Sequence, residues 1–283
     1  MPVSLPEIRE GEASPEIASL YGEIRREMRV PLVNLIYRHL ATLPGALPWS
    51  WGLLRQAVAS GALDRAQERI AHLGATFSAA PTDNAALAPP DLGPSDRGAI
   101  AALLDAYNRS NIQNLIGLTA VRKLLHGRPP DMAAAILAEL PPRRAASGPV
   151  PSALPLPRLS ELPETTASLV RALASRHESA DRGVTPSLYL HLAHWPRFLE
   201  AAQDRLEPLF ADRTLERCRD KVGRLAEIEA ETLLPYMGRE EPPGGSVLSL
   251  ERALETFTRG VIPDMIPVGF TLTRWMGAAD AGT

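Results

Sequence analysis

The chain has 283 residues, of which 45% are hydrophobic, 22% charged and 5% aromatic, a composition that supports a buried core and argues against a disordered chain. Its net charge of −3 lacks the basic excess of nucleic-acid-binding proteins, and no apolar run approaches the length of a membrane span. Because the N-terminal segment is polar and Cys218 is the single cysteine, the sequence predicts a cytoplasmic protein without disulfides and with neither nucleic-acid nor membrane partners.

Apolar residues recur at helical spacing along the first 128 residues. Ser14-Pro15-Glu16 has the composition of a helix start, and apolar residues follow at helical intervals up to Met28. Further helices are predicted at 33–44, 45–58, 62–77, 95–108 and 112–126, with Ser95 as a cap and a loop at 80–94.

The stretch 128–163 contains nine prolines, which stiffen a chain and remove backbone donors, so we predict a semi-rigid strap with a short helix at Asp131–Leu140. A second series of helices follows the strap. Among them, residues 184–196 read as a short helix with Thr185 as its cap and Pro186 at its first position. The remaining predicted helices are 164–178, 197–210, 213–235, 249–260 and 263–276.

The second series repeats the first. Tyr37 matches Tyr189 and His39 matches His191, each pair 152 positions apart, and with a slip of two residues 107–109 aligns with 257–259. We therefore predict an all-α fold made of two tandem helical repeats that form an intramolecular pseudo-dimer joined by the Pro-rich strap. The boundaries are a first repeat at 1–128, a linker at 129–163 and a second repeat at 164–283. Ligand sites are expected where such halves meet.

Three asparagines lie among apolar residues in the run 107–116, at the predicted junction of two helices. Capping of helix ends is the structural interpretation of these residues. The functional interpretation is that Asn111 and Asn114, three apart, point into one pocket and hydrogen-bond a water or a substrate. The second half has Val261 and Asp264 at these positions, so a single, asymmetric site is expected here.

The helix start at 185–188 is a second candidate, because free backbone N–H groups at Ser187 and Leu188 would favour a small carboxylate. Tyr189, which follows on this helix, is assigned to substrate binding as well. His191 and His194 have a spacing that two metal ligands use, but no carboxylate-rich segment completes a set. We expect no metal and, in the absence of nucleotide-binding motifs, no cofactor.

The chain resembles the group I 2-haloacid dehalogenases (the DehI type) over nearly its whole length, in pattern and order more than in identity. The residues that carry the resemblance are 29–33 (RVPLV), 40–45 (LATLPG), Leu47-Pro48, 108–111 (NRSN) and 193–196 (AHWP).

This resemblance implies a cofactor-free, all-α pseudo-dimer that often forms a homodimer and hydrolyses small 2-haloalkanoic acids of either hand without an ester intermediate. In the family an aspartate activates the attacking water, and an asparagine helps to hold it. The asparagine corresponds to Asn111 and a serine to Ser187, but the aspartate corresponds to Leu188 and a pocket tryptophan to Leu32. Leucine cannot accept a proton, and a general base typically contributes about 10²–10⁴-fold to the rate.

Three hypotheses follow. The first is a dehalogenase-type protein that binds a small carboxylic acid with altered or lost activity. The second is an active hydrolase with another base, for which Asp264 is the candidate. The third is a helical interaction protein without a small-molecule site. A polar-lined pocket that contains Asn111 would favour the first two, and a collapsed apolar region would favour the third.

Overall fold

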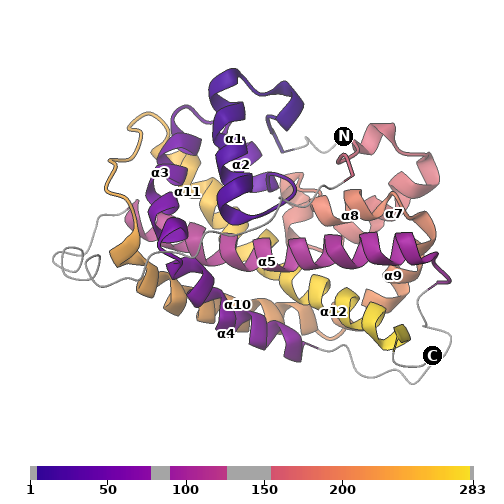
Figure 1. Cartoon of the computed structure of the whole chain (residues 1–283). Helices are drawn as coiled ribbons and strands as arrows, with labels where there is room; N and C mark the ends of the chain where they lie inside the picture. The colour runs from indigo at the N-terminus through magenta and orange to yellow at the C-terminus, as the bar shows by residue number, and fades with distance from the viewer. Residues whose placement is uncertain (1–4, 78–89, 126–153, 281–283) are drawn as a thin grey trace.

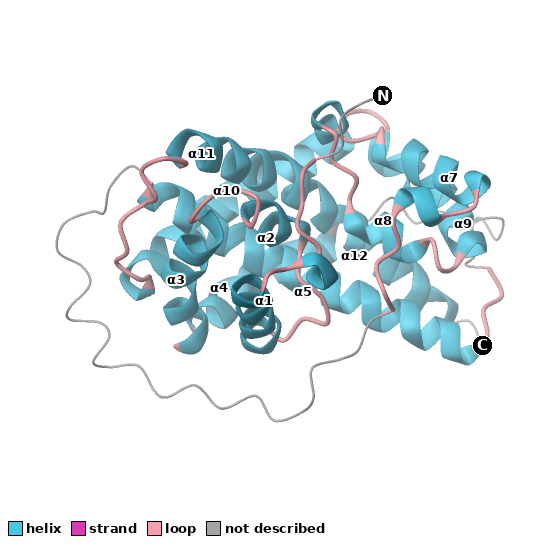
Figure 2. Cartoon of the chain, turned by 90° about the horizontal axis from the view of Figure 1, so that it is seen from above, coloured by secondary structure: helices cyan, strands magenta, loops and turns pink. Residues whose placement is uncertain are grey.

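We analysed a computed structural model of the chain, which describes residues 5–77, 90–125 and 154–280. Every regular element within these ranges is a helix, and none of the described residues forms a strand (Figure 2). The predicted all-α class is therefore confirmed. The predicted short helix at 131–140 and most of the Pro-rich strap lie outside the described residues.

Helices account for most of the described residues, both before residue 126 and after residue 153. The first part holds η1(Glu10–Glu12), α1(Pro15–Met28), α2(Leu35–Leu40), α3(Ala46–Ala59), α4(Ala62–Thr76) and α5(Pro94–Leu124). The second part holds η3(Leu159–Glu161), α7(Glu164–Ala174), η4(Glu178–Arg182), α8(Ser187–Leu192), α9(Pro196–Phe210), α10(Thr214–Leu233), η5(Leu234–Tyr236), α11(Val247–Thr256), the π-helical turn η6(Phe257–Val261) and α12(Ile262–Asp280).

The local signals at most helix starts were read correctly. Ser14 caps α1 as predicted, because its hydroxyl accepts a hydrogen bond from the N–H of Ile17. Two expectations were wrong. Residues 95–124 form one continuous helix, which begins at Pro94 after Gly93, and α8 starts one residue later than expected, with Pro186 and not Thr185 in the cap position. The asparagine run therefore lies within a helix, so helix capping does not explain it.

Helix α5 is the central element of the molecule (Figure 1). It crosses the molecule and packs against α4, α10 and α12. Its N-terminal part, with Leu104 and Tyr107, packs in a core with α7, α8, α9 and the later turns of α12. Its C-terminal part, from Ile112 onward, packs in a second core with α1 to α4, α10 and α11. The middle of α5 is therefore where the two cores meet.

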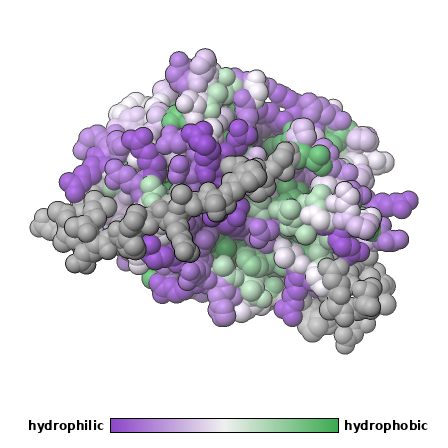
Figure 3. Space-filling view, in the orientation of Figure 1, coloured by the Kyte–Doolittle hydropathy of each residue, from purple (hydrophilic) through white to green (hydrophobic). Residues whose placement is uncertain are grey.

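Hydrophilic residues cover much of the face in Figure 3, and smaller hydrophobic areas lie among them. None of the helices in the described ranges is long and apolar enough to cross a lipid bilayer. Two extended arms, residues 5–12 and 154–161, lie over the junction of the cores and are joined by an ion pair between Arg158 and Glu12. Arg9 adds a hydrogen bond to the carbonyl of Leu156 at 3.1 Å. These arms close the molecule beside the start of α8.

Candidate functional site

A small cavity of about 40 Å³ lies where α2, α5, α8 and the start of α12 meet. Its polar lining consists of Asn34, Tyr107, Asn111, Asn114 and Ser187, and its apolar lining of Leu35, Ile36, Pro186, Leu188, Phe257, Val261, Ile262 and Met265. The lining contains no acidic and no basic side chain. A molecule that binds here has to be small, with one polar and one apolar side.

Two of the three lining amides, together with Tyr107, come from one face of α5. Tyr107, Asn111 and Asn114 are spaced at i, i+4 and i+7, which places them on the same side of a helix. All three line the cavity, so the predicted convergence of Asn111 and Asn114 is found in the structure. On the opposite wall, the π-helical turn contributes Phe257 and Val261, and π turns of this kind often occur at functional sites.

Asn114 has an unusual environment for a buried amide. Asn114 is 1% exposed, and neither its Nδ2 nor its Oδ1 has a hydrogen-bond partner among the residues that the structure describes. Leaving a buried polar group unpaired costs about 1–3 kcal/mol, so such groups need a specific explanation. Asn34 also has a free Oδ1, although its Nδ2 bonds Ser110 Oγ at 3.2 Å. The cavity therefore offers both donors and acceptors to a polar ligand.

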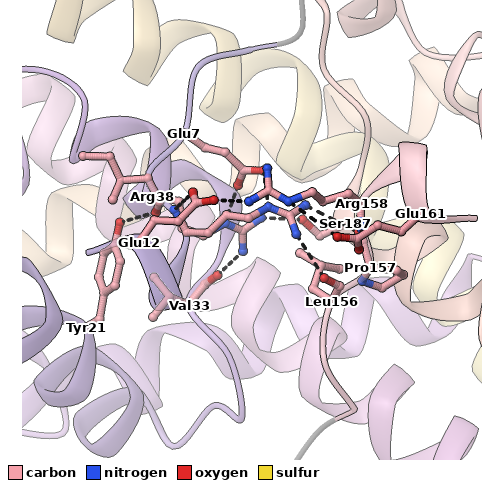
Figure 4. A network of polar contacts seen from close by, with 12 residues as sticks. Glu7, Glu12, Tyr21, Val33, Arg38, Leu156, Pro157, Arg158, Glu161 and Ser187 are labelled. Atoms are coloured by element: carbon pink, nitrogen blue, oxygen red, sulfur yellow. Dashed lines mark hydrogen bonds and ion pairs between the residues drawn. The ribbon is translucent and has the colours of Figure 1, made fainter. Parts of the chain in front are cut away.

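Ser187 is held by a buried arginine at the centre of the network in Figure 4. Arg38 donates to Ser187 Oγ at 3.1 Å, to the Val33 carbonyl at 2.5 Å and to Glu7 Oε2 at 2.5 Å. The guanidinium lies one hydrogen bond behind Ser187 and is paired with Glu7. Because α8 has only six residues, its helix dipole adds little attraction for an anion at this end.

Tyr107 connects the cavity to His191. Its hydroxyl lies 2.8 Å from His191 Nδ1, and His191 Nε2 lies 2.9 Å from the carbonyl oxygen of Leu154. The pKa of His191 is lowered to about 4, mainly by burial; the hydrogen bond to Leu154 opposes this effect, and the nearby His194 and Arg38 add to the lowering. The imidazole is therefore neutral at physiological pH.

Asp264 lies outside the cavity lining, although its neighbour Met265 is part of it. Its carboxylate is 3.1 Å from His177 Nδ1 and 3.6 Å from Arg219 Nε, and it is 1% exposed. His177 Nε2 is in turn 2.8 Å from the hydroxyl of Tyr189. The structure thus ties Asp264 and Tyr189 into a buried network instead of bringing them to the cavity.

The other predicted residues divide between the cavity and the core. Ser187 and Leu188 line the cavity, whereas Leu32 packs in the core around α8 and α9 and is absent from the lining. The sequence analysis missed Tyr107 and Asn34. Two signals pointed to them: Tyr107 lies one helical turn before Asn111, and Asn34 lies 152 positions before Pro186 at the start of the repeated phrase.

We compared the chain with known proteins, and no protein-family model matches it. It is similar to a configuration-inverting 2-haloacid dehalogenase of Alcaligenes xylosoxydans xylosoxydans, with 26% identity over 213 residues, which covers 72% of this chain and 69% of that protein. A second protein with the same description, from Pseudomonas sp. (strain 113), is 24% identical over 227 residues, which covers 79% and 73% of the two chains.

Solved structures of D-2-haloacid dehalogenase share the fold. The complex with L-LA superposes with a TM-score of 0.80 at 18% identity and covers 97% of this chain and 98% of that chain. A mutant of the enzyme in complex with D-2-CPA gives a TM-score of 0.75, with 98% of each chain covered. The chain therefore has the helical haloacid dehalogenase fold.

Burial of His191 predicts a pH-dependent loss of stability. The folded-state pKa of about 4 lies below the ordinary value of 6.5, so between these values the unfolded chain binds more protons. Stability falls as the pH is lowered through this window, by about 3 kcal/mol from this residue. His191→Gln cannot titrate and keeps a donor for Leu154. In urea unfolding at pH 7 and pH 4, this variant should lose correspondingly less stability than the native protein. Equal losses would contradict the prediction.

Substitution of Asp264 tests its role in the buried network. Asp264→Asn removes the charge that faces His177 and Arg219, and breaking a buried pair of this kind costs roughly 3 kcal/mol. Asp220→Asn, an exposed acid beside Arg219, is the control and should change stability by less than about 0.5 kcal/mol. Equal urea midpoints for the two variants would show that Asp264 does not stabilise this region.

Proposed function

We propose that this protein is a helical 2-haloacid dehalogenase of the group I type, which binds a small 2-haloalkanoic acid in the cavity and replaces its halogen by water. The observation that carries the proposal is the convergence of Asn111, Asn114 and Ser187 on one cavity within this fold. A helical interaction protein would not need buried, unpartnered amide groups around an internal cavity, so the third hypothesis is disfavoured.

The lining suits the chemistry of a 2-haloalkanoic acid. Its carboxylate would bind at the hydroxyl of Ser187, behind which Arg38 supplies a buried positive charge. The halogen and the alkyl group would contact the apolar wall of Leu188, Phe257 and Val261. The volume of about 40 Å³ favours acids with short chains. All the residues that this proposal requires for binding the acid are therefore present in the chain.

In the chemical step, Asn111 and Asn114 would hold a water that attacks the carbon bearing the halogen. The new C–O bond forms as the carbon–halogen bond breaks and the halide leaves with the bonding electrons. The family's base position holds Leu188, which is 1% exposed and apolar. We infer slow turnover, because a missing general base typically lowers a rate by about 10²–10⁴-fold.

We also propose that the fold is a tandem repeat with an internal pseudo-twofold axis at the cavity. The support is that the lining residues pair by the offset found in the sequence: residues 34, 35 and 36 with 186, 187 and 188. Likewise, 107 and 111 pair with 257 and 261. Five positions are thus contributed by both halves, but the amides come from the first half only, which makes the site asymmetric.

A second candidate function is non-catalytic binding of a small carboxylic acid. The observation that favours it is that the cavity lining contains no carboxylate to accept a proton from water. Binding and turnover have to be measured separately to distinguish it from the first proposal.

Halide release from both enantiomers of 2-chloropropionate tests the proposal. We expect slow release by the native protein and a gain of about 10²–10⁴-fold for Leu188→Asp, which places a carboxylate in the cavity beside Ser187. Ile36→Asp is the matched control, because Ile36 is the pseudo-symmetric lining residue on the other wall. It should give no gain. If neither the native protein nor Leu188→Asp releases halide, the proposed chemistry is contradicted.

We expect the Asn114 side chain to lower the stability of the protein and to strengthen its binding of the substrate. Asn114→Leu removes two unpartnered buried polar atoms, so we expect a gain of about 1–2 kcal/mol in the free energy of unfolding together with weaker binding of 2-chloropropionate. Asn108→Leu, on the same helix, breaks a 2.9 Å hydrogen bond to Thr273 Oγ1 and should destabilise the protein. Urea unfolding and calorimetric titration measure the two effects. Destabilised Asn114→Leu protein with native affinity would contradict this assignment.

A further inference from the structure

A chain of hydrogen bonds leads from the cavity to a buried histidine. Tyr107 Oη lies 2.8 Å from His191 Nδ1, and Ser187 Oγ, which accepts a hydrogen bond from Arg38 at 3.1 Å, belongs to the same cavity lining as Tyr107. The chain ends where His191 Nε2 meets the carbonyl oxygen of Leu154 at 2.9 Å. Tyr107 and Ser187 both line the cavity, so the chain borders the substrate position.

Two groups, one that can only accept and one that can only donate, determine which atom is the donor in each of these hydrogen bonds. The Leu154 carbonyl can only accept, so His191 Nε2 carries the proton and Nδ1 presents a lone pair. Tyr107 must then donate its proton to Nδ1. At the other end a guanidinium can only donate, so Ser187 Oγ accepts from Arg38 and its own proton points away, towards the tyrosine or a ligand.

This order of donors and acceptors allows Tyr107 to accept a proton from a molecule in the cavity. Tyr107 lines the cavity, so a water bound there can donate to its hydroxyl oxygen, while the tyrosine proton is directed at an unprotonated ring nitrogen. His191 is 1% exposed, and the other charged or titratable groups whose electrostatic influence reaches it are His194 and Arg38. Burial is the main cause that lowers its pKa to about 4, so the ring is neutral at physiological pH and its Nδ1 can take up a proton.

We propose that Tyr107 is the catalytic residue that accepts the proton of the attacking water in this cavity, and that His191 acts through it by taking up the tyrosine proton. The inference rests on the proposed function and names the base that Leu188 does not provide. As water bonds to the carbon and halide departs, one water proton passes to Tyr107 Oη and the tyrosine proton passes to His191 Nδ1. The resulting imidazolium then returns a proton to solvent, so the products are a 2-hydroxy acid, a halide ion and a proton.

The test compares Tyr107→Phe in the native background and in the Leu188→Asp background. Chloride release from 2-chloropropionate gives turnover, and calorimetric titration with the same acid gives binding. In the native background we expect Tyr107→Phe to lower kcat by about 10²-fold while the affinity stays nearly unchanged. In the Leu188→Asp background, where the new carboxylate takes the proton, Tyr107→Phe should have little effect.

Two further variants separate chemistry from folding. Tyr37→Phe removes another buried tyrosine hydroxyl, which lies outside the cavity lining and contacts Met28 Sδ, and it should leave turnover unchanged. His191→Gln keeps a donor for Leu154 but cannot take up a proton. It should lower kcat as Tyr107→Phe does, and it should remove the fall in native kcat that occurs as the pH is lowered through about 4.

Three results would overturn the inference. Equal losses of kcat for Tyr107→Phe in both backgrounds would assign the tyrosine a purely structural role. Native-like turnover of Tyr107→Phe would exclude it as the base. If the native protein releases no chloride but Leu188→Asp does, this inference is refuted and the proposed dehalogenase function is supported. If neither the native protein nor any variant releases chloride, both are refuted.

Discussion

The burial of a polar helix face at the meeting point of two cores is the constraint on which the rest of the structure depends. Helix α5 belongs to both cores, so its middle turns cannot reach solvent, yet they carry Tyr107, Asn111 and Asn114. Buried polar groups have to be paired or they cost free energy. The fold meets this requirement only in part: Asn114, whose two polar side-chain atoms have no hydrogen-bond partner among the described residues, lines the cavity. This incomplete pairing is what makes the junction a binding site and not simply a core.

The buried charged side chains around this junction are paired with side chains of opposite charge. Arg38 is paired with Glu7 and fixed by the Val33 carbonyl, so its guanidinium lies beside the cavity without lining it (Figure 4). Asp264 forms a separate pair with Arg219, outside the cavity lining. The described residues that line the cavity include no carboxylate, so a proton released there would pass to a neutral group, as proposed for Tyr107.

The sequence predicted the fold class, most helix boundaries and four of the residues that line the cavity. Periodicity and capping residues are local signals, which is why α1, α3, α4 and α10 were predicted closely, and the repeat placed residues 34–36 and 186–188 in equivalent positions. The continuous α5 was missed because its polar middle resembles a helix junction. Asp264 was assigned to catalysis because nothing local shows that His177, 87 residues away, holds its carboxylate. The Tyr107–His191 contact depends on tertiary packing and has no local signature.

The most direct test of the central claim is a crystal structure with bound 2-bromopropionate, in which anomalous scattering locates the bromine. We predict one bromine peak in the cavity against the apolar wall of Leu188, Phe257 and Val261, with the carboxylate at Ser187 and a water between Asn111 and Asn114. A bromine peak elsewhere in the molecule, or a cavity that stays without ligand at concentrations that saturate binding in solution, would contradict the account.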